Sequence, residues 1–123
     1  MNETELAWLA GWIEGEGTFC VTSGVGGNSG KRYQRVCLNA VSTDLDVLEY
    51  VRSIAGGRVY GPYNNGTWPN GKPYYQWTLA TAAQCEATIR QLLPLMVSAR
   101  RKEQAAIALA TIDAYKLLKV KGT

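Results

Sequence analysis

The sequence contains no histidine and only three cysteines in 123 residues. Without histidine, Ser-His and Cys-His catalysis are excluded. Cys20, Cys37 and Cys85 show neither a CxxC motif nor the Cys/His spacing of a zinc site. Any metal ion must therefore be held by oxygen ligands, which favours chemistry of the Mg²⁺ type.

Long apolar runs are also missing, since no stretch approaches the roughly 20 residues of a membrane helix. The first five residues are acidic and lack the basic and apolar pattern of a secretion signal. A hydrophobic content of 46% is normal for a globular chain. We therefore expect one domain, 1–123, in a soluble intracellular protein (cytoplasmic, or in an organelle that encodes it) with no membrane partner.

Acidic residues are absent from two long stretches, 17–43 and 50–85. The basic residues in these stretches are Lys31, Arg32, Arg35, Arg52, Arg58 and Lys72. A surface built from them is uniformly positive, as a phosphate-facing surface should be. Ordinary solvated strands that lack Asp and Glu would give the same pattern, and the net charge of +3 does not separate the two interpretations.

Residues 3–15 show the apolar spacing of a helix, with Asn2 or Thr4 as N-cap. The stripe that would face the core is Leu6, Leu9 and Ile13. A second stripe consists of Ala7, Gly11 and Gly15, spaced four residues apart. Glycine within a helix costs about 1 kcal/mol relative to alanine. The second stripe therefore predicts that another backbone approaches this helix closely.

The remaining pattern predicts two hairpins, each followed by helix. Strands span 17–42 around a glycine-rich loop at 24–30, and a helix runs from Thr43 or Asp44 to the pair Gly56-Gly57. The second hairpin joins 58–60 to 74–79 across a turn-rich loop at 64–71. Helices follow over about 82–93 and 95–118, separated at Pro94. We expect an α+β fold, with an antiparallel sheet covered by helices on one face.

The uncovered face of this sheet would carry polar and basic side chains. The apolar residues Val36, Leu38 and Ala40 alternate with Arg35, Cys37 and Asn39. One face of this strand is therefore apolar, and the other is polar and basic. The residues predicted to contact DNA are Thr22, Lys31, Arg32, Arg35, Cys37, Asn39, Arg58, Tyr60, Tyr74, Gln76 and Thr78. Such a face suits hydrogen bonding to bases in a groove, which predicts double-stranded DNA as partner and no small-molecule substrate.

Two glutamates, Glu14 and Glu16, lie at the C-terminal end of the first helix. The helix dipole is negative there, which costs about 0.3–1 kcal/mol for each carboxylate. If the glycine stripe packs against its own copy, Glu16 from both chains meets near the two-fold axis, and a cation between them relieves the repulsion. Two-metal sites suit phosphodiester hydrolysis. The alternative is a surface helix end with two solvated glutamates.

Residues 9–17 read Leu-Ala-Gly-Trp-Ile-Glu-Gly-Glu-Gly, which resembles the LAGLIDADG motif of homing endonucleases. The identical positions are Leu9, Ala10, Gly11, Ile13 and Gly17. Gly15 is the common small substitute, and both acidic positions are kept as glutamate. The resemblance implies an αββαββα fold with a further C-terminal helix. One motif in 123 residues resembles the single-motif class, which works as a homodimer.

The resemblance also implies roles for particular residues. Glu16 fills the metal-binding position with the backbone carbonyl of Gly15, and Mg²⁺ or another divalent ion such as Mn²⁺ is the implied cofactor. The implied dimer interface consists of Ala7, Gly11, Glu14 and Gly15. Glu14 takes the first acidic position of the motif, and the resemblance leaves open whether its role is catalytic or structural. Glutamate stands at the metal position in place of the more usual aspartate.

Two further regions enter the implied catalytic site. Family members carry a basic residue three places before a Gln-Ala pair in the last helical region, and here Gln104-Ala105 puts Arg101 there, beside Lys102. Their implied role is to stabilise charge near the scissile phosphate. Ser42 aligns with a glutamine often found at the end of the second strand.

The function implied is a site-specific double-stranded DNA endonuclease that hydrolyses phosphodiester bonds as a metal-dependent homodimer. Its target would be long and pseudo-palindromic, because a symmetric dimer presents the same surface twice. The alternative is a cleavage-deficient protein of the same fold, either an intron maturase or a DNA-binding regulator. Retention of the Glu16 carboxylate favours the nuclease.

Overall fold

The computed structural model describes residues 1–26, 31–64 and 72–120, with the backbone alone described at 23–26, 31–34 and 118–120. The elements are α1 (Glu3–Glu16), β1 (Gly17–Gly26), β2 (Lys31–Ser42), α2 (Leu45–Ala55), β3 (Arg58–Tyr63), β4 (Tyr74–Leu79), α3 (Ala82–Leu92), the 3₁₀ turn η2 (Leu93–Leu95) and α4 (Ala99–Val120). Two helix-and-hairpin units are thus followed by two helices. This order confirms the α+β fold predicted from the sequence.

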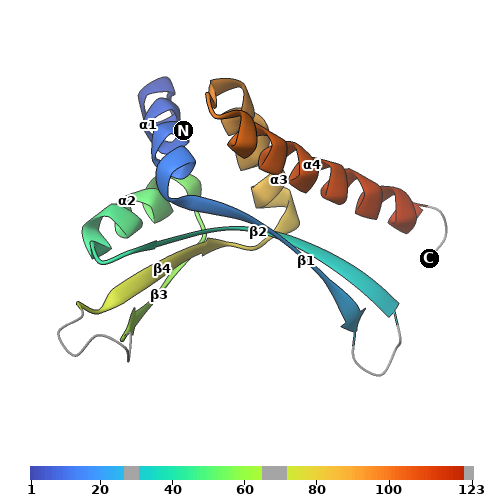
Figure 1. Ribbon diagram of the computed structural model, residues 1–123, viewed down its shortest axis with the longest axis horizontal. Coiled ribbons are helices and arrows are strands. Elements are labelled where there is room, and N and C mark those ends of the chain that lie inside the picture. Colours follow the sequence, from blue (N-terminus) through green and yellow to red (C-terminus); the bar gives the residue numbers. More distant parts are fainter. Residues whose placement is uncertain (27–30, 65–71, 121–123) are drawn as a thin grey trace.

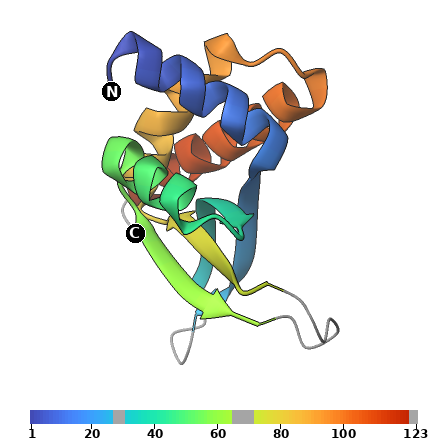
Figure 2. The ribbon, with the colours of Figure 1, turned by 90° about the vertical axis from the view of Figure 1, so that its left-hand side faces the viewer.

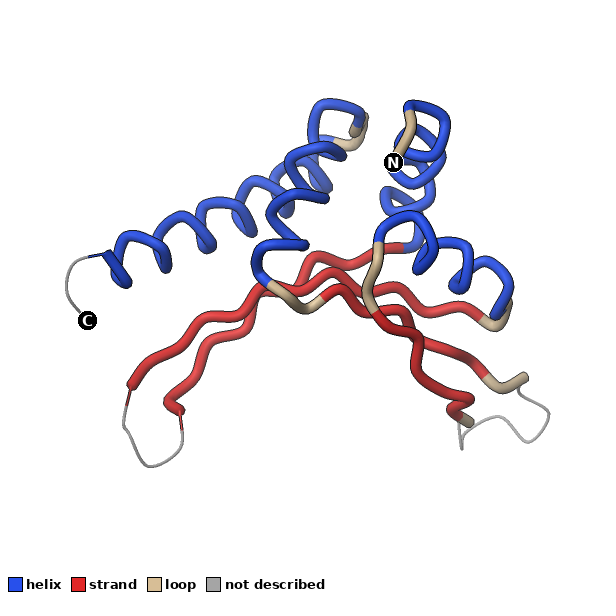
Figure 3. Tube along the Cα trace, turned by 180° about the vertical axis from the view of Figure 1, so that it is seen from behind, coloured by secondary structure: helices blue, strands red, loops and turns tan. Residues whose placement is uncertain are grey.

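The four strands form one antiparallel sheet in the order β1-β2-β4-β3. All helices lie on the same side of it, as the views in Figures 1 and 2 show. The ends of both hairpins bend away from the helices, so the uncovered face is concave (Figure 3). A concave sheet of this kind can curve around a rod-shaped partner.

The core lies between the helices and the covered face of the sheet. Leu9 and Ile13 from α1 are completely buried, together with Leu38 of β2 and Trp77 of β4. Each large apolar side chain buried in this way stabilises the fold by about 1.5–3 kcal/mol. The indole Nε1 of Trp77 donates a hydrogen bond to the backbone oxygen of Gly56 at 2.8 Å, which ties the end of α2 to the sheet.

The structure differs from the sequence prediction at the last two helices and the third strand. Pro94 sits inside η2, and Met96 after it has an extended backbone (φ −77°, ψ 145°), so the final α-helix begins at Ala99 rather than near residue 95. The third strand continues to Tyr63, beyond the predicted Tyr60. In the described part of the chain, no helix combines the length and apolar character needed to cross a bilayer.

Candidate nucleic-acid interface and active-site residues

The strand register aligns polar side chains in rows across the uncovered face. Directly opposed residues of antiparallel strands point to the same side of a sheet. One row, called here the central row, consists of Thr18, Asn39, Thr78 and Arg58. On one side of the central row lies a row of Val41, Gln76 and Tyr60. On the other side lies the pair Cys20 and Cys37, and beyond it the pair Thr22 and Arg35.

The structure therefore places on this face every predicted DNA-contacting residue whose side chain it describes. Tyr74 joins the set because it alternates with Gln76 and Thr78 along β4 and pairs with Tyr63. Lys31 and Arg32 belong to β2, but their side chains lie outside the described part of the chain. The four strands contain no aspartate or glutamate. The face therefore combines positive charge with many hydrogen-bonding groups.

Hydrogen bonds connect the side chains of this face. Gln76 Nε2 donates to the hydroxyl of Thr78 at 3.1 Å, and Asn39 Nδ2 donates to the sulfurs of Cys20 and Cys37 at 3.1 and 3.5 Å. Asn39 Oδ1 is buried and has no hydrogen-bond partner among the described residues. Partial burial and the neighbouring thiol of Cys20 raise the pKa of Cys37. Both thiols lie on the uncovered face, in the row next to the central row.

Glu14 is held by the beginning of α4. Its Oε2 accepts hydrogen bonds from the backbone N–H groups of Val97 and Ser98 at 2.8 and 2.7 Å. These two hydrogen bonds lower the pKa of Glu14, and the charges of Lys102 and Arg101 add to the effect. The N-terminus of a helix carries partial positive charge, which favours a carboxylate there. Glu14 thus joins the end of α1 to the start of α4.

Arg101 reaches the same end of α1. Its Nε donates to the backbone oxygen of Glu14 at 3.1 Å, and its Nη1 donates to Gln104 Oε1 at 3.1 Å. The guanidinium therefore offsets the negative end of the helix dipole, which no basic residue nearby in the sequence does. The predicted catalytic residue Arg101 and its neighbour Gln104 are in this way brought to the motif helix.

Glu16 differs from Glu14 in its surroundings. Glu16 is exposed as the last residue of α1, and its carboxylate makes no hydrogen bond or ion pair with any described residue. The chain then enters β1 directly, because Gly17 pairs with Ala40 of β2. The carboxylate of Glu16 is therefore positioned where α1 meets the sheet and is available to a ligand.

The oxygen donors at the end of α1 are of the kind that a divalent ion prefers. They are too few to hold such an ion by themselves. Glu16 supplies a carboxylate and Gly15 a backbone carbonyl, both of which are preferred by Mg²⁺. Among the described residues, no three Asp, Glu, Cys or His side chains form a cluster that could hold a metal ion. Donors beyond these described side chains are therefore required to complete such a site.

Ser42 forms a local hydrogen bond at the start of α2. Its hydroxyl accepts a hydrogen bond from the backbone N–H of Asp44 at 2.9 Å, just before α2. Ser42 pairs with Tyr75, which packs against the core, so it alternates to the helix-covered side. The uncovered face at this end of the sheet carries Val41 and Gln76 instead. The structure does not bring Ser42 together with the polar rows.

The stripe formed by Ala7, Gly11 and Gly15 lies on the surface of the chain. A Cβ atom added at Gly11 or Gly15 would meet no described atom within 4 Å. Trp8 lies beside the stripe, 39% exposed, and its ring stacks on Trp12 at a centroid distance of 5.9 Å. Packing within the chain therefore does not explain why these positions are small.

Sequence reasoning missed several residues of these two sites. Thr18, Cys20 and Val41 share the uncovered face, and the same alternation that identified their neighbours would have found them. The amides of Val97 and Ser98 carry no sequence signal, because any residue type supplies a backbone N–H.

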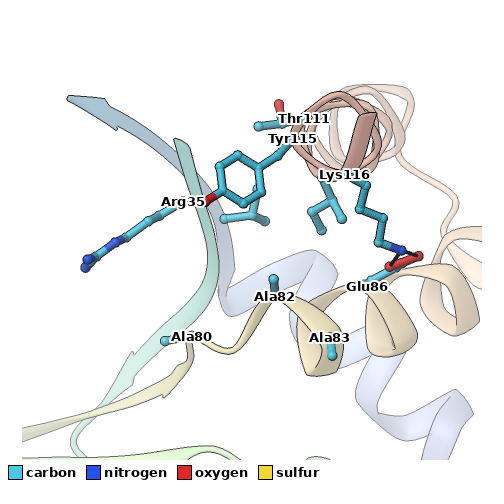
Figure 4. A pocket seen from close by; sticks show the side chains of 10 residues that line it. Arg35, Ala80, Ala82, Ala83, Glu86, Thr111, Tyr115 and Lys116 are labelled. Carbon is cyan, nitrogen blue, oxygen red and sulfur yellow. Dashed lines mark hydrogen bonds and ion pairs between the residues drawn. The ribbon is translucent and has the colours of Figure 1, made fainter. Parts of the chain in front are cut away.

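A pocket of about 610 Å³ lies elsewhere, between β2, α3 and α4 (Figure 4). Lys116 Nζ donates to Glu86 Oε1 at 2.7 Å, and this hydrogen bond lowers the pKa of Glu86. Figure 4 shows the side chain of Arg35 extending away from α4. The charges of Glu86 and Lys116 neutralise each other within the pocket. Glu16 does not line the pocket, so the pocket is separate from the candidate site at the end of α1.

No protein-family model and no curated protein sequence matches the chain. Three solved structures illustrate its structural similarity. The homing endonuclease I-CvuI, in complex with the I-CreI target, has a TM-score of 0.73 and 22% identity over 90% of this chain and 67% of that one. For the intron-encoded I-CeuI complexed with DNA the values are 0.75 and 15%, over 98% and 59%. For I-TnaI they are 0.73 and 15%, over 90% and 73%.

These similarities show that the chain has the fold of homing endonucleases, among which the structure of a LAGLIDADG meganuclease, I-CpaMI, also matches. The chain spans about two thirds of the length of I-CvuI, and less of I-CeuI.

Proposed function

We propose that the chain is a LAGLIDADG homing endonuclease, which binds a long double-stranded DNA site as a homodimer and cuts it with the help of a divalent metal ion. One observation carries the proposal. The motif at residues 9–17 forms the C-terminal part of α1 and the first residue of β1. Glu16, the last residue of α1, is exposed at the edge of a concave sheet whose strands lack acidic residues. A carboxylate beside a phosphate-attracting surface can hold a metal ion next to a phosphodiester, which suits metal-dependent hydrolysis.

The concave face would bind the DNA groove. Arg35 and Arg58 are exposed on it, and arginine can donate two hydrogen bonds to guanine in the major groove. Gln76 can donate to and accept from adenine in the same way, and Asn39 would do so once its buried Oδ1 turns outward. The acid-free surface would attract phosphates before any base is read. I-CeuI and I-Vdi141I, which share the fold, are described in complex with DNA.

Glu16 and the carbonyl of Gly15 would hold the divalent ion, with Glu16 of a second copy and DNA phosphates as the additional oxygen ligands. Once bound, the ion would supply positive charge beside the scissile phosphate. Arg101 is held at the end of α1 by its hydrogen bonds to Glu14 and Gln104, so its charge is already oriented. With Lys102 it would stabilise the negative charge that develops during cleavage. The I-CvuI structures are described with Mg or Ca.

Dimer formation would occur along the stripe of small residues on α1. Two helices that cross at Ala7, Gly11 and Gly15 can bring their backbones close, because no side chain separates them. A two-fold axis through this contact would bring both copies of Glu16 near each other and would require a nearly palindromic target. The protein would act inside the cell or organelle that contains this DNA.

The test compares binding with cleavage on a fixed DNA target, which is selected from a library of candidate sites by gel-shift binding and then assayed for plasmid nicking in the presence of Mg²⁺. Glu16→Gln keeps the shape of the side chain and removes its charge, so nicking should fall by orders of magnitude while gel-shift affinity is kept. Glu3→Gln is the matched control, because it is exposed at the opposite end of the same helix. Glu14→Gln should reduce nicking less than Glu16→Gln.

The outcomes separate the possible functions. If Glu16→Gln nicks as fast as the unmodified protein, the active site lies elsewhere and the assignment fails. If the unmodified protein binds DNA but never nicks it with Mg²⁺ or Mn²⁺, the alternative of a cleavage-deficient maturase or regulator replaces the nuclease.

A further inference from the structure

Cys20 and Cys37 are directly opposed on neighbouring strands of the uncovered face. Asn39 Nδ2 donates to both sulfurs, at 3.1 and 3.5 Å, so the two thiols share one neighbour. Directly opposed residues of antiparallel strands have Cα atoms about 4.5–5.5 Å apart. This separation lies within the range of roughly 4.4–6.8 Å found for disulfides. Little backbone movement is therefore needed to join the two sulfurs.

The third cysteine lies in a different environment. Cys85 is completely buried, and its thiol donates to the backbone oxygen of Leu79 at 2.9 Å. Burial raises the pKa of Cys85 to about 11 and shields its thiol from solvent, whereas partial burial raises the pKa of Cys37 but leaves its side chain accessible. Cys20 and Cys37 are only partly buried. A small oxidant therefore reaches the opposed pair and is kept from the third thiol.

We propose that Cys20 and Cys37 form an oxidisable pair, which a hydroperoxide converts into a disulfide within one chain. One thiolate attacks a peroxide oxygen, the O–O bond breaks, and the sulfur becomes a sulfenic acid while the alcohol or water leaves with a proton. The second thiol then attacks this sulfur and displaces its hydroxyl as water. Two thiols and one hydroperoxide give one disulfide, one alcohol (or water) and one further water, so the two electrons lost by sulfur reduce the peroxide.

The disulfide would alter the central row of the face. It draws the two Cβ atoms from about 4.5–5.5 Å to roughly 3.8 Å apart. Asn39 donates to both sulfurs, so its side chain must reorient when they move. Asn39 is paired with Thr18 and Thr78, in the middle of the surface proposed to read DNA. This consequence rests on the proposed function. It predicts DNA binding weaker by at least roughly fivefold, equivalent to the loss of one base contact.

The experiment treats the folded protein with hydrogen peroxide at low protein concentration, alkylates the remaining thiols after denaturation, and measures intact mass and tryptic peptides. We expect the loss of two hydrogens, a peptide pair joined through Cys20 and Cys37, and alkylation of Cys85 alone. Cys85→Ala should form the same disulfide, whereas Cys20→Ser and Cys37→Ser should not. Gel shifts then compare reduced, oxidised and re-reduced protein.

Each result decides the question. Three alkylated cysteines after peroxide, a disulfide to Cys85, or a cross-link between chains would overturn the pair. Equal affinity of the oxidised and reduced forms would overturn the effect on DNA. If the reduced protein binds no DNA at all, the proposed function fails, and the mass measurement still decides whether the pair exists.

Discussion

Gly11 tests whether α1 packs against a second chain, because the expected effects on the single chain and on the dimer have opposite signs. Within one chain a Cβ atom at Gly11 would meet no described atom within 4 Å. Replacing a helical glycine by alanine then stabilises the helix by about 1 kcal/mol. For a domain of this size, Gly11→Ala should raise the Tm of the monomer by roughly 3–5 °C.

In a closely packed dimer the same methyl group has no space. Overpacking a tight contact costs about 1–3 kcal/mol, and the two-fold axis applies this cost at both copies of Gly11. The dimer should therefore lose at least about 2 kcal/mol, which raises its dissociation constant about thirtyfold. Gly11→Leu should be monomeric at micromolar concentration while remaining folded.

Sedimentation velocity over a concentration series measures the dissociation constant, and thermal unfolding at low concentration measures the stability of the monomer. Gly17→Ala is the control for strain within one chain. Its added Cβ atom would lie 2.9 Å from the Ile13 side chain, so this substitution should destabilise the monomer itself. The reasoning is refuted if the unmodified protein is a monomer. A dissociation constant that Gly11→Ala leaves unchanged within twofold would also refute it.

Three further predictions concern DNA, metal and pH. Arg35→Ala or Arg58→Ala should weaken target binding by roughly 1–3 kcal/mol if the contact is to a base, and gel shifts should show affinity falling steeply with salt; silent substitutions with flat salt dependence would exclude this face. Chelation with EDTA should stop plasmid nicking and leave the gel shift intact, whereas nicking that persists would rule out a metal ion. The pKa of Glu14 is lowered in the fold, so its stabilising effect is complete above the ordinary glutamate pKa of about 4.3 and is lost as pH falls through the lowered value. Urea unfolding between pH 6 and pH 3 (roughly the range in which glutamates titrate) should therefore show a flatter acid limb for Glu14→Gln, and identical limbs would contradict the role of Glu14.

The helices, the strands and the motif could be predicted from the sequence because their signals are local. Leu9 and Ile13 recur with the period of a helix and are both buried in α1. Val36, Leu38 and Ala40 alternate with the period of a strand, which identified the covered and uncovered faces before any pairing was known. The acidic end of the motif could likewise be assigned to the end of its helix.

The tertiary structure alone supplied the physical difference between the two glutamates of the motif, whose different positions the resemblance had already assigned. Glu14 accepts hydrogen bonds from amides 83 and 84 residues away, and Arg101 reaches the same helix end across 87 residues. The strand register likewise brought Cys20 opposite Cys37. The positions of such distant groups depend on how helices pack on the sheet and how strands align, and neither periodicity nor residue type along the chain contains that information.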